Sequence, residues 1–316
     1  MPLRPERLFF FGEHAVVYGE PALVASIDKR VYVSVNLSDE KISRVYSNEY
    51  DQAAKFKIDK SPPPHLPQIF KPVWTVCKEI SSLTSLHKGF DISIKSEIPP
   101  GAGLGSSAAV SVATAAALNA CLDLDLSNSE ISSIAFGAEK TVHGTPSGID
   151  NTIATYGGAI LYEKGNMKQV KIKTEIPLVI GDSGVKRSTA EWVGKVKLRK
   201  QRQERIMKPI IKSIGLIVME GLKLLDKNDF RALGELMDIN QGLLEAIGVS
   251  IFELNKLINA ARQSGAYGAK LTGAGGGGCM IALSPEDRQK QIADAILKAG
   301  GKPLITNLSQ QGVKIE

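Results

Sequence analysis

Cysteine is scarce in this sequence. The 316 residues contain three, Cys77, Cys121 and Cys279, which are odd in number and far apart. A disulfide framework or a zinc site usually has paired or closely spaced cysteines, so we expect neither. Unpaired thiols fit a reducing compartment, and we expect a cytoplasmic protein.

Long apolar runs are also absent. The longest, Ala108 to Leu122, is rich in alanine, serine and threonine and contains Asn119. It is too short and too polar to span a bilayer, and it predicts a buried helix. Near the start, Leu8 to Phe11 provides only four apolar residues before a glycine, too few for a signal peptide. We therefore expect no membrane partner.

Neither sign of charge dominates. Lys and Arg number 39 against 33 Asp and Glu, which gives a net charge of +6. That excess suits anionic ligands but is too mild to indicate nucleic-acid binding. The densest basic run, Lys195 to Lys208, has almost no interleaved aromatic residues. We interpret it as a solvated helix face; alternatively, one or two of its cations guide an anionic substrate. No nucleic-acid partner is expected.

What the sequence does contain is a glycine-rich string before a helix, Pro99-Pro100-Gly101-Ala102-Gly103-Leu104-Gly105-Ser106-Ser107-Ala108-Ala109. Glycine allows positive φ angles and a close approach of the backbone to an anion. The N–H groups and positive dipole end of the following helix face the same loop. The pattern predicts a phosphate cradle, although it matches neither the Walker motif nor the dinucleotide fingerprint.

The order of expected elements indicates an α+β chain with two lobes. Strands or hairpins are predicted over 7–11, 22–37, 41–59, 89–97, 158–173, 177–183, 267–271, 279–283 and 302–307. Helices are predicted over 68–84, 108–122, 128–142, 188–208, 209–226, 229–246, 251–264 and 286–299. Between residues 143 and 151, two glycines and a proline predict a stiff loop that carries Asp150.

Two further motifs accompany the glycine-rich string. They are Phe11-Gly12-Glu13-His14-Ala15-Val16-Val17-Tyr18-Gly19-Glu20 and Lys270-Leu271-Thr272-Gly273-Ala274-Gly275-Gly276-Gly277-Gly278-Cys279. In this order the three strings resemble the motifs of the GHMP small-molecule kinases, over nearly the whole chain. The first string and the segment from Glu139 to Asp150 are most similar to the mevalonate kinases. The resemblance implies a two-lobed GHMP kinase fold, with a ribosomal-S5-like N-terminal lobe (1–174) and a ferredoxin-like C-terminal lobe (175–316).

The resemblance also implies a nucleotide and metal site. ATP would be bound by Pro100, Gly101, Ala102, Gly103, Leu104, Gly105, Ser106, Ser107, Ala108 and Ala109. Ser107 and Glu139 match the family's Mg²⁺ ligands, and one hydroxyl with one carboxylate is enough for this ion. Which of Ser106 and Ser107 binds the metal stays open. Asp150 falls on the family's catalytic aspartate, which can accept the proton of an attacking hydroxyl.

The acceptor side is expected elsewhere in the chain. By resemblance, Glu13, His14 and Asp150 are expected to bind the acceptor, and Arg187 and Thr189 offer it a cation and a hydroxyl. An arginine can bind a carboxylate through two parallel bonds; the alternative is an exposed Lys-Arg pair at a helix start. The third motif would shape the wall of the phosphate site through glycines that let two backbones approach closely: Gly273, Gly275, Gly276 and Gly277.

The chain leaves the family pattern at one position. Arg7 stands where the family usually has a lysine that is a catalytic candidate. An arginine stays protonated and cannot shuttle a proton, so we expect it to act electrostatically.

The resemblance implies an enzyme that phosphorylates mevalonate to 5-phosphomevalonate with Mg-ATP, in isoprenoid precursor biosynthesis, and that forms a homodimer. The same fold could instead serve phosphomevalonate, homoserine, a sugar or the 3-hydroxyl of mevalonate. A galactokinase would carry Thr-Asp rather than Ala-Val after Gly-Glu-His. A non-catalytic binding protein should have lost Asp150 or Glu139, and both are present.

Overall fold

The computed structural model describes residues 3–58, 61–84, 88–97, 106–143 and 147–315. Its strands form two sheets. The seven-stranded sheet has the order β4-β3-β5-β2-β6-β7, with β1 paired to β2, and the four-stranded sheet has the order β11-β8-β10-β9. The strands are β1 (Leu3–Phe11), β2 (Ala22–Leu37), β3 (Ser43–Ser47), β4 (Gln52–Phe56), β5 (Phe90–Ser96), β6 (Ala159–Glu163), β7 (Asn166–Val170), β8 (Pro177–Asp182), β9 (Gly268–Leu271), β10 (Cys279–Leu283) and β11 (Lys302–Asn307).

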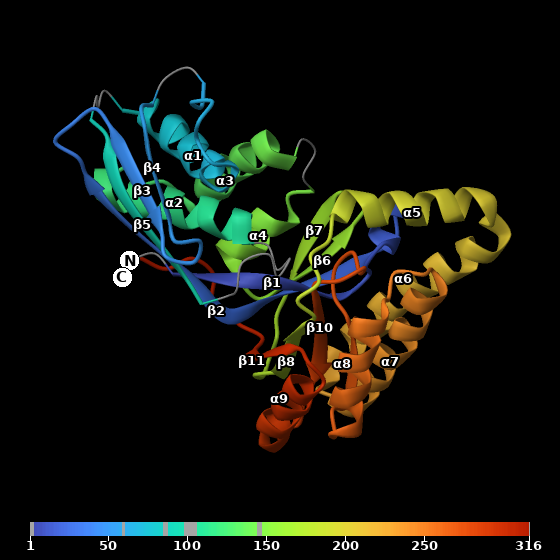
Figure 1. Cartoon of the computed structure of the whole chain (residues 1–316). Coiled ribbons are helices and arrows are strands. Elements are labelled where there is room, and N and C mark those ends of the chain that lie inside the picture. Colours follow the sequence, from blue (N-terminus) through green and yellow to red (C-terminus); the bar gives the residue numbers. More distant parts are fainter. Residues whose placement is uncertain (1–2, 59–60, 85–87, 98–105, 144–146, 316) are drawn as a thin grey trace.

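Four helices pack together on one face of the first sheet (Figure 1): α1 (Lys71–Ser81), α2 (Ser106–Leu122), α3 (Asn128–His143) and α4 (Ile149–Tyr156). Helix α2 packs against α1, α3, α4 and β2. A helix that is enclosed on all sides can be apolar all round, which explains its long stretch of alanine and valine. None of the helices in the described part of the chain has both the length and the apolar character that a membrane crossing needs.

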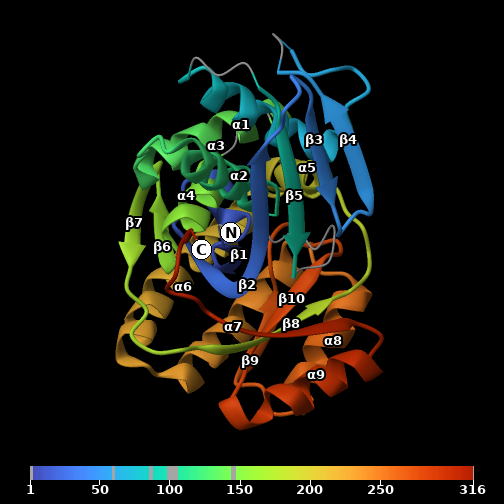
Figure 2. The ribbon, with the colours of Figure 1, turned by 90° about the vertical axis from the view of Figure 1, so that its left-hand side faces the viewer.

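The remaining long helices are α5 (Thr189–Arg202), α6 (Glu204–Lys227), α7 (Phe230–Ala246), α8 (Phe252–Gln263) and α9 (Gln289–Lys298), and the 3₁₀ turns are η1 (Ala15–Tyr18), η2 (Gln68–Phe70) and η3 (Glu286–Arg288). Helices α7, α8 and α9 pack against the four-stranded sheet. Figure 2 shows this sheet and its helices below the first sheet.

One hydrophobic core joins the two sheets. It combines Phe10 and Phe11 of β1 with Leu178 and Ile180 of β8 and with Val218 of α6, all of which are buried. The last residues of β1 therefore lie between the two halves of the molecule. The motif that follows β1 is held in place by both.

The structure confirms most of the predicted elements, and the bounds of β2, β10 and β11 are those expected from the sequence. Two predictions were wrong. Asp150 is not in a loop but in the first turn of α4, because Gly148 adopts a left-handed conformation (φ 78°) and the helix begins directly after it. The break between α5 and α6 falls at Gln203, not before Pro209. Pro209 lies inside α6, and the helix continues through it.

Candidate active site

Ser107 and Glu139 come together from two helices. Ser107 lies in the first turn of α2 and Glu139 in the last turns of α3. Ser107 Oγ donates a hydrogen bond to Glu139 Oε1 at 2.6 Å. Glu139 is 4% exposed and Ser107 is half-buried. Among the described residues, no three histidine, cysteine, aspartate or glutamate side chains form a metal cluster. Mg²⁺ needs few protein oxygens, and this hydroxyl and carboxylate fit it.

The rest of the predicted nucleotide loop cannot be described. Residues Pro100 to Gly105 lie outside the described residues, and Ser106 is described only as the first residue of α2. Ala108 and Ala109 are buried in the same helix. The start of α2, whose N–H groups can face an anion, is thus placed beside Glu139.

Asp150 is half-buried on α4, which packs against α2 and α3. The adjacent Asn151 fixes this helix, because its Nδ2 donates to Ser132 O at 3.1 Å and to Ser132 Oγ at 2.8 Å. Ser132 and Glu139 belong to the same helix, α3. The carboxylate of Asp150 is therefore carried by a helix tied to the one that holds Glu139.

Glu13 lies in the turn after β1 and is 2% exposed. Its Oε1 forms an ion pair with Lys270 Nζ, and both side chains are fully buried. Its Oε2 accepts from Asn240 Nδ2 at 3.3 Å. Burial raises the pKa of Glu13 and lowers the pKa of Lys270, while the charge of each partner opposes both shifts. Each oxygen of Glu13 thus has a protein partner, and the side chain is closed off from the solvent.

The backbone of His14 has a positive φ (59°, with ψ −41°), which is uncommon outside glycine. Its Nε2 lies 3.0 Å from the carbonyl oxygen of Ala274. A carbonyl can only accept, so Nε2 carries the proton and Nδ1 of the neutral ring is an acceptor. Burial lowers the pKa of His14, and the nearby charge of Arg187 adds to this, whereas the hydrogen bond to Ala274 opposes it. The lowered pKa favours the neutral ring, and the Ala274 carbonyl selects its Nε2–H tautomer.

The glycines of the third motif make room for several neighbours. A Cβ at Gly276 would lie 1.8 Å from Trp192, and one at Gly273 would lie 2.9 Å from Arg187. Backbone also approaches closely: Gly276 N donates to Val249 O at 2.7 Å. Gly273 to Gly278 therefore form a surface, called the glycine surface below, against which the side chains of Arg187 and Trp192 pack.

Arg187 and Thr189 are near neighbours, as the sequence predicts. Arg187 Nη1 donates to Thr189 Oγ1 at 3.2 Å, at the start of α5. Arg187 is half-buried and Thr189 is exposed. Arg187 also contributes to the electrostatic environment of His14. The structure thus brings His14, Arg187 and the glycine surface together, although they come from three distant parts of the sequence.

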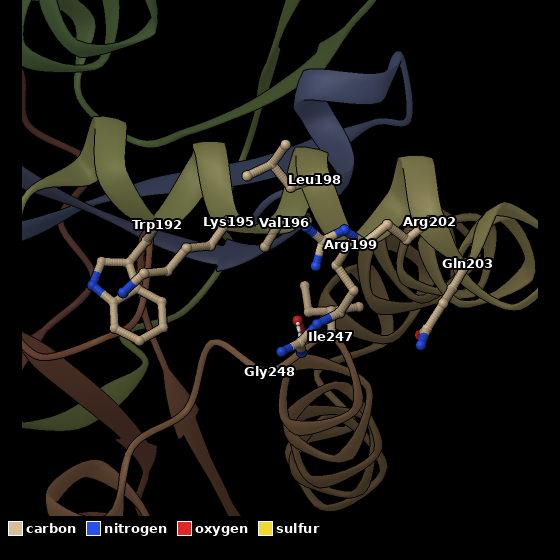
Figure 3. A pocket seen from close by; sticks show the side chains of 9 residues that line it. All are labelled: Trp192, Lys195, Val196, Leu198, Arg199, Arg202, Gln203, Ile247 and Gly248. Carbon is tan, nitrogen blue, oxygen red and sulfur yellow. Dashed lines mark hydrogen bonds between the residues drawn. The ribbon is translucent and has the colours of Figure 1, made fainter.

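Figure 3 shows a pocket of about 460 Å³ under α5. The side chain of Arg199 extends from α5 toward the end of α7, where Arg199 Nη1 donates to Ile247 O at 2.6 Å, and Trp192 lines the other end of the pocket. A cation is favourable at the carbonyl end of a helix, so Arg199 has a structural role. Most of the basic run from Lys195 to Lys208 is exposed, which confirms the prediction of a solvated face.

Two partners of the site were missed in the sequence, Lys270 and Asn240. Lys270 lies on β9, whose four residues are all buried. A lysine within a short apolar strand next to a glycine run could have drawn attention. Asn240 gives no such signal within α7. Arg7 pairs with Ser26 across β1 and β2, and its side chain lies outside the described residues.

Known proteins resemble this chain along its whole length. The models of the GHMP kinases N-terminal and C-terminal domains match residues 69–158 and 222–302. The mevalonate kinase of Pyrococcus abyssi is 40% identical, over 99% of this chain and 96% of its own, and that of Aeropyrum pernix is 33% identical, over 99% and 97%.

Solved structures give the same result. The mevalonate kinase of L. major, in complex with R-mevalonate, matches with a TM-score of 0.84 at 29% identity, over 98% of this chain and 96% of that one. The mevalonate kinase of Methanococcus jannaschii matches with a TM-score of 0.86 at 27% identity, over 98% of both chains. The chain holds Ser107 against Glu139 and brings Arg187 near His14. By its similarity to these proteins, it belongs to the mevalonate kinase family of the GHMP kinases.

Proposed function

We propose that this protein transfers the γ-phosphoryl group of ATP to the 5-hydroxyl of mevalonate and so acts in isoprenoid precursor biosynthesis. The observation that carries the proposal is the relation to mevalonate kinases over nearly the full length of both chains, one of them solved with R-mevalonate. Mevalonate has one carboxylate and two hydroxyls. A half-buried arginine beside a neutral histidine acceptor suits such a molecule.

In this proposal the acceptor is held by His14 and Arg187. The guanidinium of Arg187 binds the carboxylate, and Thr189 adds a hydroxyl next to it. Nδ1 of His14 has no hydrogen-bond partner among the described residues, and it accepts from a substrate hydroxyl. Glu13 contributes to the same pocket through its position next to His14.

The reaction itself is assigned to the N-terminal lobe. The 5-hydroxyl oxygen attacks the γ-phosphorus, the bond to the β,γ-bridging oxygen breaks, ADP leaves, and the carboxylate of Asp150 takes the hydroxyl proton. The loop from Pro100 to Ser106 and the start of α2 cradle the triphosphate. Gly273, Gly275, Gly276 and Gly277 shape the opposite wall. Ser107 and Glu139 would hold Mg²⁺, which neutralises charge on the phosphates when bound.

Arg7 is proposed to stabilise negative charge on the transferring group. Arg7→Met should then lower kcat by roughly 10²–10³, the scale for the loss of one preorganised donor. Arg7→Lys should retain much of the activity because it keeps the charge. If Arg7 is only a solvated residue on β1, Arg7→Met should leave kcat within about twofold. Steady-state kinetics of the two variants side by side decides this.

A panel assay tests the function. ATP consumption is measured with mevalonate, phosphomevalonate, homoserine and galactose, and the product is analysed by phosphorus NMR to separate 5- from 3-phosphorylation. Of the four acceptors, we expect only mevalonate to be turned over, with 5-phosphomevalonate as the product. Turnover with another acceptor, or none with mevalonate, would overturn the proposal. Chelation of Mg²⁺ should abolish turnover, and added Mg²⁺ should restore it.

Three broader expectations accompany this function. We propose that residues 1–174 and 175–316 form the two lobes, that the protein is a homodimer, and that it works in the cytoplasm. Light scattering should then give about twice the chain mass of 33.9 kDa; a monomeric mass would contradict the dimer. Cell fractionation tests the location, and limited proteolysis tests whether cleavage near residue 174 releases two stable pieces.

A further inference from the structure

The ion pair between Glu13 and Lys270 is unusual in this molecule. Of the ion pairs formed between described residues, it alone has both side chains at 0% exposure; in each of the others, both side chains are at least 27% exposed. Burying two charges carries a large desolvation cost, and well-packed apolar residues are often at least as stabilising. Stability alone is therefore a weak reason for this pair.

The pair joins two of the three sequence motifs, and it does not act alone. Thr272 Oγ1 donates to Phe9 O at 3.0 Å and accepts from Phe9 N at 3.1 Å. His14 Nε2 contacts Ala274 O at 3.0 Å. Together with Glu13 and Lys270, these contacts hold residues 9–14 against residues 270–274. Asn240 of α7 supports the same carboxylate from a third direction.

His14 follows Glu13 directly and has a positive φ. Such a conformation carries strain in a residue other than glycine, and it persists only where neighbouring contacts fix it. The carboxylate of Glu13 cannot move without leaving Lys270 uncompensated in the interior, so the residue before His14 is firmly fixed. The orientation of the His14 ring depends on the Ala274 carbonyl, four residues after Lys270.

We propose that Glu13 and Lys270 form a buried positioning pair, which holds His14 against the glycine surface with Nδ1 directed to the substrate, and that neither side chain contacts the substrate. This differs from the sequence expectation for Glu13. The consequence for mevalonate rests on the proposed function. The consequence for the His14 tautomer does not, because it concerns only the contact with Ala274 that the pair is proposed to hold in place.

The test uses the full-length variants Glu13→Gln, Lys270→Met and the double Glu13→Gln/Lys270→Met. The double variant removes both charges of the pair and leaves neither uncompensated, so it remains informative if a single variant does not fold. Glu220→Gln serves as the matched control, because Glu220 and Lys223 form an exposed pair at 2.8 Å. Two quantities are measured: the His14 signals in two-bond ¹H–¹⁵N spectra of histidine-labelled protein, and the KM values for mevalonate and ATP. His14→Gln identifies the signal among the four histidines.

We expect wild type and control to show the Nε2–H tautomer of His14. In the variants of the pair the signal should move toward a mixture of tautomers. KM for mevalonate should rise about 10- to 100-fold, the scale for a misplaced binding group, and KM for ATP should stay within about twofold. The double variant should melt no lower than the single ones and still show the mixed tautomer.

Two results would overturn the proposal. If the His14 signal keeps its tautomer while KM for mevalonate rises in Glu13→Gln, Glu13 contacts the substrate directly. If the double variant regains both the tautomer and the wild-type KM, the pair serves only to neutralise its own charges. Should the wild type not use mevalonate at all, the proposed function fails, and the spectra still decide the positioning role.

Discussion

Glu139 and Glu13 are both almost completely buried, yet their surroundings differ. Glu139 has a neutral hydroxyl partner, Ser107, which is half-buried at the start of α2. Glu13 has a buried ammonium and a buried amide, Lys270 and Asn240, one on each oxygen. A hydroxyl can turn and offer its lone pairs to a cation, whereas an ammonium cannot. The contrast fits the roles proposed above, metal binding for Glu139 and the positioning of its neighbours for Glu13.

Asp150 gives the largest expected effect, because it is the half-buried carboxylate assigned to the chemistry. Asp150→Asn keeps the shape and removes the base, so kcat should fall by about two to four orders of magnitude. KM for ATP should hardly change. Asp294→Asn, on the exposed face of α9, is the control. Near-normal turnover of Asp150→Asn would remove Asp150 as the base.

The metal assignment separates the two glutamates directly. Glu139→Gln and Ser107→Ala should each weaken the use of Mg-ATP by at least about tenfold, and raised Mg²⁺ should relieve part of the defect. Glu13→Gln should show no such relief. The measurement is kcat/KM for ATP as a function of free Mg²⁺. If Glu139→Gln shows the wild-type dependence on Mg²⁺, the contrast between the two glutamates disappears.

Arg187 tests the acceptor side. A charge-assisted hydrogen bond contributes about 1.5–3 kcal/mol, so Arg187→Ala should raise KM for mevalonate about 10- to 100-fold. KM for ATP should change far less. Arg202→Ala, in the exposed basic run, is the matched control. An equal change in both KM values for Arg187→Ala would point to a general distortion of the site rather than to a lost carboxylate partner.

The smallest effect concerns pH. The pKa of His14 is lowered in the folded state, so below about pH 6.5 the unfolded chain takes up a proton that the folded one does not. The titration of His14 should therefore reduce the free energy of unfolding as the pH falls below about 6.5, until the pH reaches the pKa of His14 in the folded protein. Thermal melts of wild type and His14→Gln between pH 8 and 5 measure it. A variant with the same pH dependence as wild type would show that His14 titrates normally.

The fold could largely be predicted from the sequence where local pattern decides. The alternation in β2 and the apolar composition of β10 indicated strands whose bounds the structure confirms. Helix α4 was missed because two glycines and a proline precede it, and these residues normally mark a loop. The break at Gln203 was missed because Pro209 is the stronger local signal, although α6 tolerates it near its start.

The candidate site was only partly predictable. Ser107 and Glu139 were selected by resemblance and do meet. Their roles, and those of Asp150, Arg187 and Thr189, stay predictions. Nothing in the sequence linked Glu13 to Lys270, because the two residues are 257 positions apart, and such a contact depends on how β1 and β9 are brought together.

The sequence by itself determined the family, the order of strands and helices, and the chemical groups available: glycines for close approach, a hydroxyl, carboxylates and a few cations. These follow from residue type and spacing, which are local. Tertiary structure alone decided which partner each of these two carboxylates meets. Whether a carboxylate faces a hydroxyl at a helix start or an ammonium in the interior depends on the packing of distant segments. That packing also fixes the neutral tautomer of His14, because burial and the Ala274 carbonyl come from the fold.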